Sequence, residues 1–568
     1  MRILRSLQSR RRWLDLSTSS AWQARSSWRC KVAACAFFIC FALAGYADQF
    51  GDFTYEEYDT TIEITDYPEY ATGDVIIPSE IVGKPVTSIG ERAFYRCSSL
   101  TGVTIPDSVT SIGEKAFYDC RGLTSVTIPD SVTSIGYGAF IACTSLTAIE
   151  VNAASPSYSS LGGVLFNKNQ TSLIIFPAGK GGSYTIPNSA TSIGQSAFYG
   201  CSSLTSVTIP DSVTSIEGGA FYECSNLTSV TIGNGVTSMG FFAFAYCSSL
   251  TSVTIPESVT SIGEAAFASC SSLTSVTIPD SVTSVGGEAF YYCTGLTSVT
   301  IGSGVTSTGD RAFSRCSSLT AITVSAANPA YNSVDGVFFN KNQTMLIRCP
   351  GGKVGSYAIP DSVISIEHAA FSSCTSLTSV TIPDSVTKIG DDAFFGCSSL
   401  RAIYFEGNAP SLGESVFWNT VATTYHLAGT TDWGTTYGDR PTAEISVLPD
   451  PLIIGTPVDG MEGWFLSDWW GEYKATYAPW LFHAEHGFIF RYPESTYGSL
   501  YFYDDAMGAW WWTSESTYPF LYAFDPPADN AGRDIEAEWL WYFEETKTPR
   551  SFGVVTGDHA GSFLYYDP

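Results

Sequence analysis

Ser108-Val-Thr-Ser-Ile-Gly-Glu-Lys-Ala-Phe-Tyr-Asp-Cys-Arg-Gly-Leu-Thr-Ser-Val-Thr-Ile-Pro-Asp130 is one copy of a unit that recurs along most of the chain. A Phe followed three residues later by a Cys marks eleven copies. The interval between successive copies is constant, as from Cys97 to Cys120, except for two longer gaps that end at Cys201 and Cys374. A fixed period of roughly 20–50 residues predicts a solenoid, because each unit buries its apolar edge only by stacking on the next unit.

The repeated Phe and Cys are expected to form the structural core. The positions in this predicted core are Phe94, Cys97, Phe117, Cys120, Phe140, Cys143, Phe198, Cys201, Phe221, Cys224, Phe244, Cys247, Phe267, Cys270, Phe290, Cys293, Phe313, Cys316, Phe371, Cys374, Phe394 and Cys397. A twelfth Phe, at position 417, is followed by Thr420 where Cys is expected. Such decay of the repeat predicts a capping unit, because terminal units of a solenoid are atypical.

Two different spacings occur within one unit. The segment Val126-Thr-Ile128 alternates between apolar and polar residues, as a half-buried strand does. Ile112, Ala116 and Cys120 are four residues apart, which is a helical interval. We therefore expect each coil to contain a short parallel strand, a turn and a short helical arm.

The form Leu-x-x-Val-x-Ile-Pro followed by Ala-Phe-x-x-Cys resembles the leucine-rich repeat, and in particular the BspA-like subfamily of bacterial and protist surface proteins. The resemblance covers roughly residues 61–445. It implies a curved right-handed leucine-rich-repeat solenoid with a parallel sheet along one face, within a predicted domain of residues 48–446. Relatives of this kind are implicated in adhesion, so the resemblance implies a binding function rather than an enzymatic one.

Two insertions interrupt the period, near residues 152–185 and 325–358, and they are copies of one another. Ser160–Pro177 matches Ser333–Pro350 along its length, and each segment places two apolar runs around an Asn-Lys-Asn-Gln tip. This pattern predicts a β-hairpin. Loops on a rigid scaffold often carry binding residues, but the repetition of the insertion favours a lateral spacer.

The first residues of the chain have the composition of a secretory signal. Residues 1–31 contain eight Arg or Lys and one Asp, and the apolar run 32–44 that follows is too short to span a bilayer. We interpret residues 1–47 as a signal peptide. The rest contains no further apolar stretch of membrane length, so we expect the protein to be secreted or held at the cell surface, without a transmembrane segment after cleavage.

The acidity of the chain excludes one class of partner. The formal net charge is −27, so the protein repels nucleic-acid phosphates and no nucleic-acid partner is expected. A turn position contributes repeatedly to this charge: Asp107, Asp130, Asp211, Glu257, Asp280, Asp361 and Asp384. Such a column of carboxylates is open to Ca²⁺ binding, but an acidic residue after Pro is also typical of the turn itself, and we favour the turn.

The repeated cysteines allow three interpretations. A disulfide framework suits small domains without a core, and metal binding is disfavoured because the column lacks CxxC pairs and nearby His ligands. We interpret the thiols as small apolar core residues, with oxidation of some neighbouring pairs left open. Between positions 93 and 417 the only histidine is His368, so the many hydroxyl groups lack a general base. No catalytic residue, metal or cofactor is predicted.

The outward positions of the predicted strands form the candidate ligand-binding face. They carry a Ser and a Thr in seven copies: Ser125, Thr127, Ser206, Thr208, Ser229, Thr231, Ser252, Thr254, Ser275, Thr277, Ser298, Thr300, Ser379 and Thr381. A hydroxyl-lined, nearly uncharged sheet suits an extended protein or glycan, although Ser and Thr on a solvated strand surface have the same pattern.

A change of composition after residue 446 indicates a second domain. Residues 447–456 are a predicted linker, and residues 457–568 alternate aromatic runs with turn residues, which predicts a small all-β domain rich in Trp and Tyr. Its aromatic side chains either stack on sugars or fill its core. His483-Ala-Glu-His486 is a weak metal motif, because its histidines lie between apparent strands rather than on a helix.

These features predict a non-enzymatic protein of the cell surface or the exterior that mediates protein–protein contacts or adhesion to matrix or host. The alternative is binding of a glycan or cell wall by the aromatic domain, with the solenoid as a spacer. A metal-dependent hydrolase centred on His483 and His486 is a weaker third hypothesis.

Overall fold

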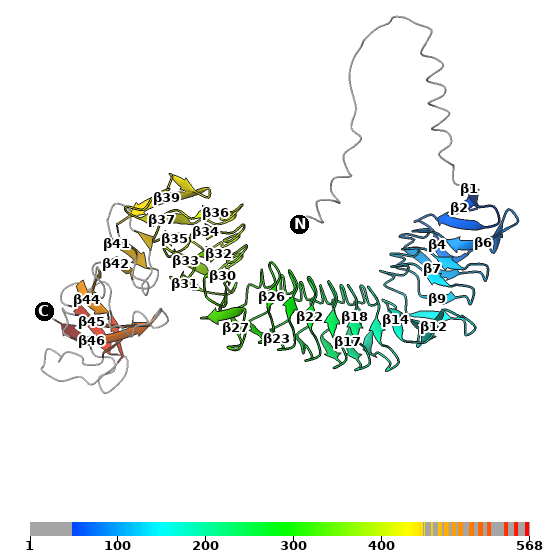
Figure 1. The fold of residues 1–568 in the computed structure, drawn as a ribbon, viewed down its shortest axis with the longest axis horizontal. Helices are drawn as coiled ribbons and strands as arrows, with labels where there is room; N and C mark the ends of the chain where they lie inside the picture. The colour runs from blue at the N-terminus through cyan, green and yellow to red at the C-terminus, as the bar shows by residue number, and fades with distance from the viewer. Residues whose placement is uncertain are drawn as a thin grey trace, which may run out of the picture.

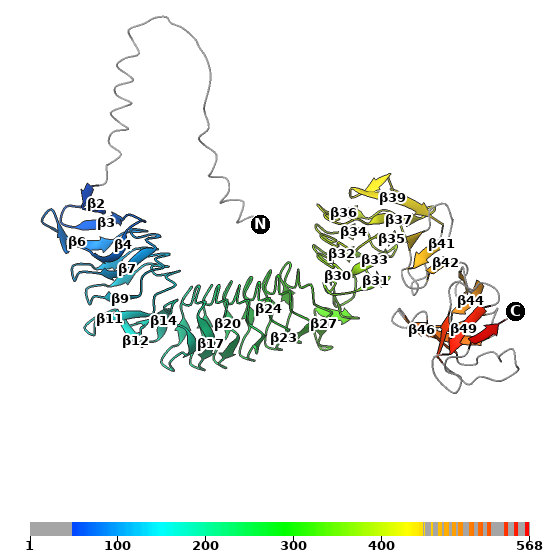
Figure 2. The same ribbon diagram turned by 180° about the vertical axis from the view of Figure 1, so that it is seen from behind.

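The computed structural model describes residues 48–446 and 448, together with the backbone of eleven short strands between residues 456 and 566. The predicted signal peptide, most of the predicted linker and the side chains of the predicted C-terminal domain lie outside the described residues. Residues 48–446 form a parallel β-solenoid, which Figures 1 and 2 show from opposite sides.

Each regular coil of the solenoid contributes one longer and one shorter strand. The short strand β8 (Ser111–Ile112) leads through a segment of turns, residues 113–120, to the longer strand β9 (Ser125–Ile128). We call such a segment of turns an arm. β8 pairs in parallel with β10 (Ser134–Ile135) of the next coil, and β9 pairs in parallel with β11 (Ala148–Val151). Stacking therefore produces two parallel ladders, one from each strand type.

The remaining strands of the array follow the same scheme. The longer ones are β4 (Thr72–Ile76), β7 (Ser99–Thr104), β15 (Gly182–Thr185), β17 (Leu204–Ile209), β19 (Ser229–Ile232), β21 (Ser252–Val253), β23 (Ser275–Ile278), β25 (Ser298–Ile301), β27 (Ala321–Val324), β31 (Gly355–Ala358), β33 (Leu377–Ile382), β35 (Ala402–Phe405) and β37 (Thr423–Leu427). The second ladder contains β6 (Lys84–Ile89), β14 (Ser172–Ile175), β16 (Ser192–Ile193), β18 (Ser215–Ile216), β20 (Ser238–Met239), β22 (Ser261–Ile262), β24 (Ser284–Val285), β26 (Ser307–Thr308), β30 (Met345–Arg348), β32 (Ser365–Ile366), β34 (Lys388–Ile389) and β36 (Ser411–Leu412).

The arms are not helical, so the prediction of helical arms was wrong, and no helix occurs in the described part of the chain. The amide of Cys97 donates to the Phe94 carbonyl three residues earlier (3.3 Å), whereas the amide of Phe94 donates to Ala116 of the next coil (2.7 Å). Arg92 and Arg96 have φ of 59°, as the second central residue of a type II turn requires. Because alternate amides donate to the next coil, they are not available for the hydrogen bonds of a helix.

The repeated Phe side chains form a continuous stack in the core of each part of the array. All eleven Phe and all eleven Cys of the predicted core are at most 2% exposed. Neighbouring rings lie between 4.5 Å (Phe198 and Phe221) and 5.6 Å (Phe290 and Phe313) apart, measured between centroids. The Cys247 Sγ donates to the Phe221 carbonyl of the preceding coil at 3.2 Å, and this bond recurs along the column. Each Cys is thus both a small core residue and a hydrogen-bond donor.

The close spacing between coils also favours glycine before most arms, although Glu217 and Glu367 occupy this position in two coils. A Cβ built on Gly113 would lie 2.5 Å from the Gly90 carbonyl carbon of the preceding coil. Gly113 has an ordinary negative φ, so its role is to let two backbones approach closely rather than to adopt a left-handed conformation.

The array changes direction at both insertions (Figures 1 and 2). In the first insertion β12 (Tyr158–Leu161) pairs antiparallel with β13 (Val164–Asn167), and β13 pairs antiparallel with β14. In the second, β28 (Tyr331–Val334), β29 (Val337–Asn340) and β30 pair in the same way. Each insertion then supplies a longer strand, β15 or β31, but has no arm. We call the two places the first bend and the second bend.

Different pairings close the two ends of the array. At the start, β1 (Asp48–Phe50), β2 (Phe53–Glu57) and β3 (Ile62–Asp66) pair antiparallel, β3 joins β6 in parallel, and β5 (Glu80–Ile81) pairs with β6. At the other end β39 (Arg440–Ile445) pairs with both β37 and β38 (Thr436–Tyr437). Thr420 replaces the repeated Cys there, and its hydroxyl donates to Phe417 of its own coil rather than to the preceding coil (2.9 Å).

The C-terminal strands pair antiparallel in chain order within one sheet. They are β40 (Thr456–Pro457), β41 (Trp464–Ser467), β42 (Gly471–Ala475), β43 (Trp480–His483), β44 (Gly487–Arg491), β45 (Ser499–Asp504), β46 (Ala509–Ser514), β47 (Phe520–Ala523), β48 (Trp539–Tyr542), β49 (Arg550–Val554) and β50 (Phe563–Tyr566). That this segment is an independent aromatic-rich domain stays a prediction. Within the described residues, no helix has the length and apolar character needed to cross a membrane.

Candidate functional site

The outward side of the longer strands is the candidate binding surface. In β9 the side chains of Val126 and Ile128 are buried, while Ser125 and Thr127 are exposed on the opposite side. The same alternation occurs in β19, β23 and β25. It follows from the period of two along a strand, which sends successive side chains to opposite faces. We call the outward Ser and Thr of the longer strands, together with Thr254 directly after β21, the hydroxyl face.

The parallel register aligns the hydroxyl face into rows. Ser206 pairs with Ser229, and Thr208 pairs with Thr231. The same register joins Ser229 to Ser252, Ser275 to Ser298 and Thr277 to Thr300. Because neighbouring strands in a sheet lie about 4.8 Å apart, each row presents equivalent hydroxyl groups at this interval within the two sheets β15-β17-β19-β21 and β23-β25-β27. The rows are interrupted between β21 and β23, which do not pair. From β17 to β25 no charged side chain interrupts the outward positions.

Most hydroxyl groups of this face are free to bond a ligand. The Thr residues that begin each longer segment are used internally, because Thr228 donates to the Thr205 carbonyl (3.0 Å) and Thr251 donates to the Thr228 carbonyl (3.3 Å). By contrast, among the described residues no hydrogen bond engages the hydroxyls of Thr254 and Thr277. Ser206 is an exception, since its hydroxyl donates to Ser183 at 2.7 Å.

The last pair of predicted positions differs from the others. Ser379 in β33 is only 3% exposed and its hydroxyl lacks a hydrogen-bond partner, and Thr381 is half-buried. The adjacent strand β35 places Tyr404, whose ring stacks on Tyr425 at 5.3 Å, beside Thr381 in the register. The expectation of an exposed position at Ser379 was therefore wrong, because large aromatic residues replace the small polar ones in the following coils.

The acidic turn column consists of turn residues in the structure. The Asp211 carboxylate accepts a hydrogen bond from the Asn234 amide (2.7 Å), and the Asp280 carboxylate accepts one from the Ser303 amide (2.5 Å). Each carboxylate thus joins its turn to the next coil. In the part of the chain that the structure describes, no group of three His, Cys, Asp or Glu side chains is placed to hold a metal ion.

The thiols of the cysteine column are shielded from solvent. All twelve thiols from Cys97 to Cys397 are buried and free. Burial raises the pKa of the Cys270 thiol to about 12, and it also raises that of the Cys316 thiol to about 12. Only the thiolate is nucleophilic, so the Cys270 and Cys316 thiols, which stay protonated at neutral pH, are poor nucleophiles. Cys349, the cysteine of the second insertion, occupies the position of Phe176 in the first insertion and is also buried.

The histidine within the repeat array, His368, gives no support to catalysis. The His368 Nε2 accepts a hydrogen bond from the Arg311 Nε at 2.8 Å, so this nitrogen is not available to activate a hydroxyl. His483 ends β43 and pairs with Gly487, while its side chain and His486 lie outside the described part of the structure. The hydrolase hypothesis therefore gains no geometric support.

Two pockets at the bends were not predicted from the sequence. A pocket of about 170 Å³ lies at the first bend and one of about 200 Å³ at the second bend. The available signal was the charged Arg348 within the apolar run Met345–Cys349, at a position where the duplicate insertion has Ile175. Aligning the two insertions reveals this charge, because only one of the two copies has a charged residue in its apolar run.

Comparison with known proteins identifies the repeat. The family model described as BspA type leucine rich repeat region (6 copies) matches residues 73–181, 176–293, 240–350 and 350–431. A leucine-rich repeat protein from Bacteroides ovatus is 26% identical, with a TM-score of 0.42, over 70% of this chain and 100% of that chain. A leucine rich cell surface protein from Faecalibacterium prausnitzii is 27% identical, with a TM-score of 0.34, over 69% and 91% of the two chains. The pneumococcal vaccine antigen PcpA is 18% identical, with a TM-score of 0.34, over 58% and 93%. No curated protein matches the chain.

Proposed function

Because the chain belongs to the BspA-type leucine-rich repeat family, we propose that it is a non-enzymatic protein of the cell surface or the exterior that binds an extended extracellular ligand with its hydroxyl face. The ligand is a protein or a glycan of the matrix or the host. The predicted signal peptide at residues 1–47 supports the compartment, and the family supports a binding role.

The observation that carries this proposal is the regular row of exposed, internally unbonded hydroxyl groups. Thr254, Thr277 and Thr300 repeat at equivalent positions of consecutive coils and are exposed. A hydroxyl group both donates and accepts hydrogen bonds. Such rows fit a partner that itself presents polar groups at regular intervals, and binding at several coils at once raises the overall affinity without any single strong contact.

The repetition also argues against a small-molecule site on this face. Sites for small ligands are concave and bring a few unlike polar groups together. The hydroxyl face instead repeats the same Ser-Val-Thr-Ile segment in β19, β23 and β25. Equivalent groups spread along a sheet favour an extended partner over a compact one.

The second candidate function is glycan or cell-wall binding by residues 457–568, with the solenoid as a spacer. The supporting observation is the concentration of aromatic residues in this segment, for example the Trp510-Trp-Trp512 run in β46. Aromatic rings have the flat apolar surface that stacks on sugar rings.

Screening on arrays of matrix proteins and glycans tests both proposals. We expect the full chain and residues 48–449 to bind the same ligand, and residues 452–568 to be dispensable. Retention of the ligand by residues 452–568 alone would instead support the aromatic segment as the binder.

A charge substitution then locates the binding surface. The double variant T254R/T277R places two long charged side chains on the hydroxyl face, and we expect it to weaken binding by at least ten-fold. The matched control S272R/S318R adds the same charge at two exposed positions outside the longer strands. Equal binding by the two double variants would refute the hydroxyl face as the site.

A further inference from the structure

The two bends leave equivalent gaps in the row of arms. Because each insertion lacks an arm, the arm at residues 136–143 faces the arm at residues 194–201 across the first bend. Residues 309–316 face residues 367–374 in the same way across the second bend. The chain therefore contains two versions of one pocket, built on equivalent positions of a duplicated insertion, in which most of the lining side chains differ.

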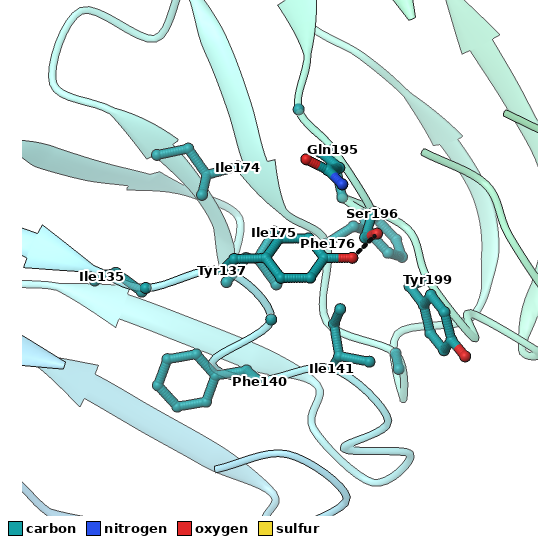
Figure 3. Close-up of a pocket in the computed structure, with 15 residues that line it drawn as sticks. Ile135, Tyr137, Phe140, Ile141, Ile174, Ile175, Phe176, Gln195, Ser196 and Tyr199 are labelled. Carbon is teal, nitrogen blue, oxygen red and sulfur yellow. Dashed lines mark hydrogen bonds between the residues drawn. The ribbon is translucent and has the colours of Figure 1, made fainter. Parts of the chain in front are cut away.

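The pocket at the first bend is mostly apolar, and two of its polar side chains bond each other. Figure 3 shows Ile141, Ile174 and Ile175 around it, with the Tyr137 hydroxyl directed at Ser196. The two hydroxyl oxygens are 2.9 Å apart. This pair also joins the arms on the two sides of the bend. Among the described residues that line this pocket, none is charged.

The pocket at the second bend replaces two of these apolar side chains with polar ones. Arg348 occupies the position of Ile175, and Ser314 occupies the position of Ile141. Both residues line the pocket, and they are only 4% and 2% exposed. The apolar part of the wall includes Phe338 and Ile347.

Arg348 is a buried cation without an anionic partner in the described part of the chain. Its two terminal nitrogens donate to the carbonyls of Ala369 and Ser372, the latter at 2.9 Å, and both acceptors are neutral. Its Nε has no hydrogen-bond partner there, and neither has the Ser314 hydroxyl. Burial of a charge is costly unless the charge is paired. Two unsatisfied donors in one pocket therefore indicate an absent acceptor.

The other charged groups near this pocket do not supply that acceptor. Arg311 uses its guanidinium on Asp392 (2.8 Å) and on the His368 ring. The carboxyl-bearing residues Asp310 and Glu367 line the pocket, but neither forms an ion pair with Arg348 within residues 48–446.

Backbone donors add to the pocket at the second bend. In a regular coil the amide of Phe290 donates to the Ala312 carbonyl of the next coil at 2.8 Å. The equivalent amide of Phe313 faces the gap where the next arm is missing, and it has no backbone acceptor among the described residues. The amide of Arg311, which also belongs to this row, has none either. At the first bend the equivalent amides of Gly138 and Phe140 also have no backbone acceptor among the described residues, so these donors are common to both pockets.

We propose that the pocket at the second bend binds the carboxylate of a small ligand with a short apolar body. Because the Arg348 Nε and the Ser314 hydroxyl are both closed off from solvent, their side chains must turn toward the cavity to bond the carboxylate, while the apolar body contacts Phe338 and Ile347. A volume of about 200 Å³ is adequate for a benzene-sized group, since a cavity of about 150 Å³ accommodates benzene. This site is independent of the hydroxyl face and requires no second protein.

Titration of the full chain with benzoate, with isovalerate and with the neutral analogue benzamide tests the site, with calorimetry and ligand-observed NMR as readouts. We expect a carboxylate to bind and benzamide not to bind. The variant R348I gives the second bend the residue of the first bend, and we expect it to lose at least ten-fold in affinity for that carboxylate. The variant R348M tests the same loss of charge with a flexible side chain, in case R348I folds poorly.

Three results would overturn the proposal. The first is that neither carboxylate binds at millimolar concentration. The second is that benzamide binds as tightly as the carboxylates. The third is that R348I or R348M binds the carboxylate as tightly as the wild type does. The variant I175M is a matched control at the first bend, and we expect it to bind the carboxylate as the wild type does. Circular dichroism of each variant confirms that the solenoid is folded.

Discussion

Removal of one ring from the middle of the Phe stack is the sharpest test of the core. Phe244 is fully buried, and its ring lies 4.9 Å from Phe221 and 5.3 Å from Phe267. Substitution of a buried Phe by Ala costs about 3–5 kcal/mol through lost transfer free energy and a residual cavity. Because Phe244 stacks on both sides, we expect F244A to lie in the upper part of that range, at about 4–5 kcal/mol.

The effect of F244A should also be local. In a solenoid each coil contacts only its neighbours, so a weakened central coil destabilises the two interfaces that it forms. Native-state hydrogen exchange should show the largest loss of protection in β20 and the strands beside it, with urea unfolding giving the global loss of free energy. The control F241A removes a ring that is 52% exposed, and we expect a change within about 0.5 kcal/mol. Equal destabilisation by F244A and F241A would refute the Phe stack as the core.

Three further predictions concern hydrogen bonds, close contacts and thiols. The Thr260 hydroxyl donates to the Thr237 carbonyl of the preceding coil at 3.1 Å, so T260V should lower the free energy of unfolding by about 1 kcal/mol. The control T254V removes a hydroxyl that has no internal partner among the described residues. It should leave the free energy of unfolding nearly unchanged in the same urea titration. G113A places a Cβ 2.5 Å from the backbone of the preceding coil and should destabilise the fold by about 1–3 kcal/mol. In the control G287A the new Cβ would lie 3.4 Å from its nearest atom, and the substitution should be tolerated. Equal melting temperatures of the two variants would contradict this difference. Burial raises the pKa of the Cys270 thiol from 9.0 to about 12. Between pH 9 and 12 the unfolded state therefore releases a proton that the folded state retains. Because of this difference, the urea midpoint of unfolding should fall as the pH rises through this range. Reaction of the native thiols with a disulfide reagent at pH 7 would contradict that burial.

The repeat allowed several structural features to be predicted from one copy. A fixed period implies that equivalent positions stack, and Phe117 and Cys120 are fully buried in that column. The alternation in Ser125–Ile128 determines which side chains point outward. These features depend on local spacing alone, since side chains alternate between the two faces of a strand and a solenoid repeats every coil.

The same local spacing was misleading for the arms. Ile112, Ala116 and Cys120 are four residues apart in two successive turns as well as in a helix. What distinguishes the two structures is the acceptor of each amide, and Phe117 donates to Ala139 of the next coil at 2.8 Å. Because this acceptor belongs to a different copy of the repeat, periodicity within one copy carries no information about it.

The sequence by itself therefore determined the stacking period, the buried column and the outward hydroxyl groups, because these follow from spacing within one unit. Only the tertiary structure decided where the array bends and what lies in each gap, because these depend on contacts across a missing arm. Arg311 meets His368 at 2.8 Å although the two residues belong to coils on opposite sides of an insertion. The burial of Arg348 without a counter-ion among the described residues has the same origin, since its surroundings come from two coils that the insertion brings together.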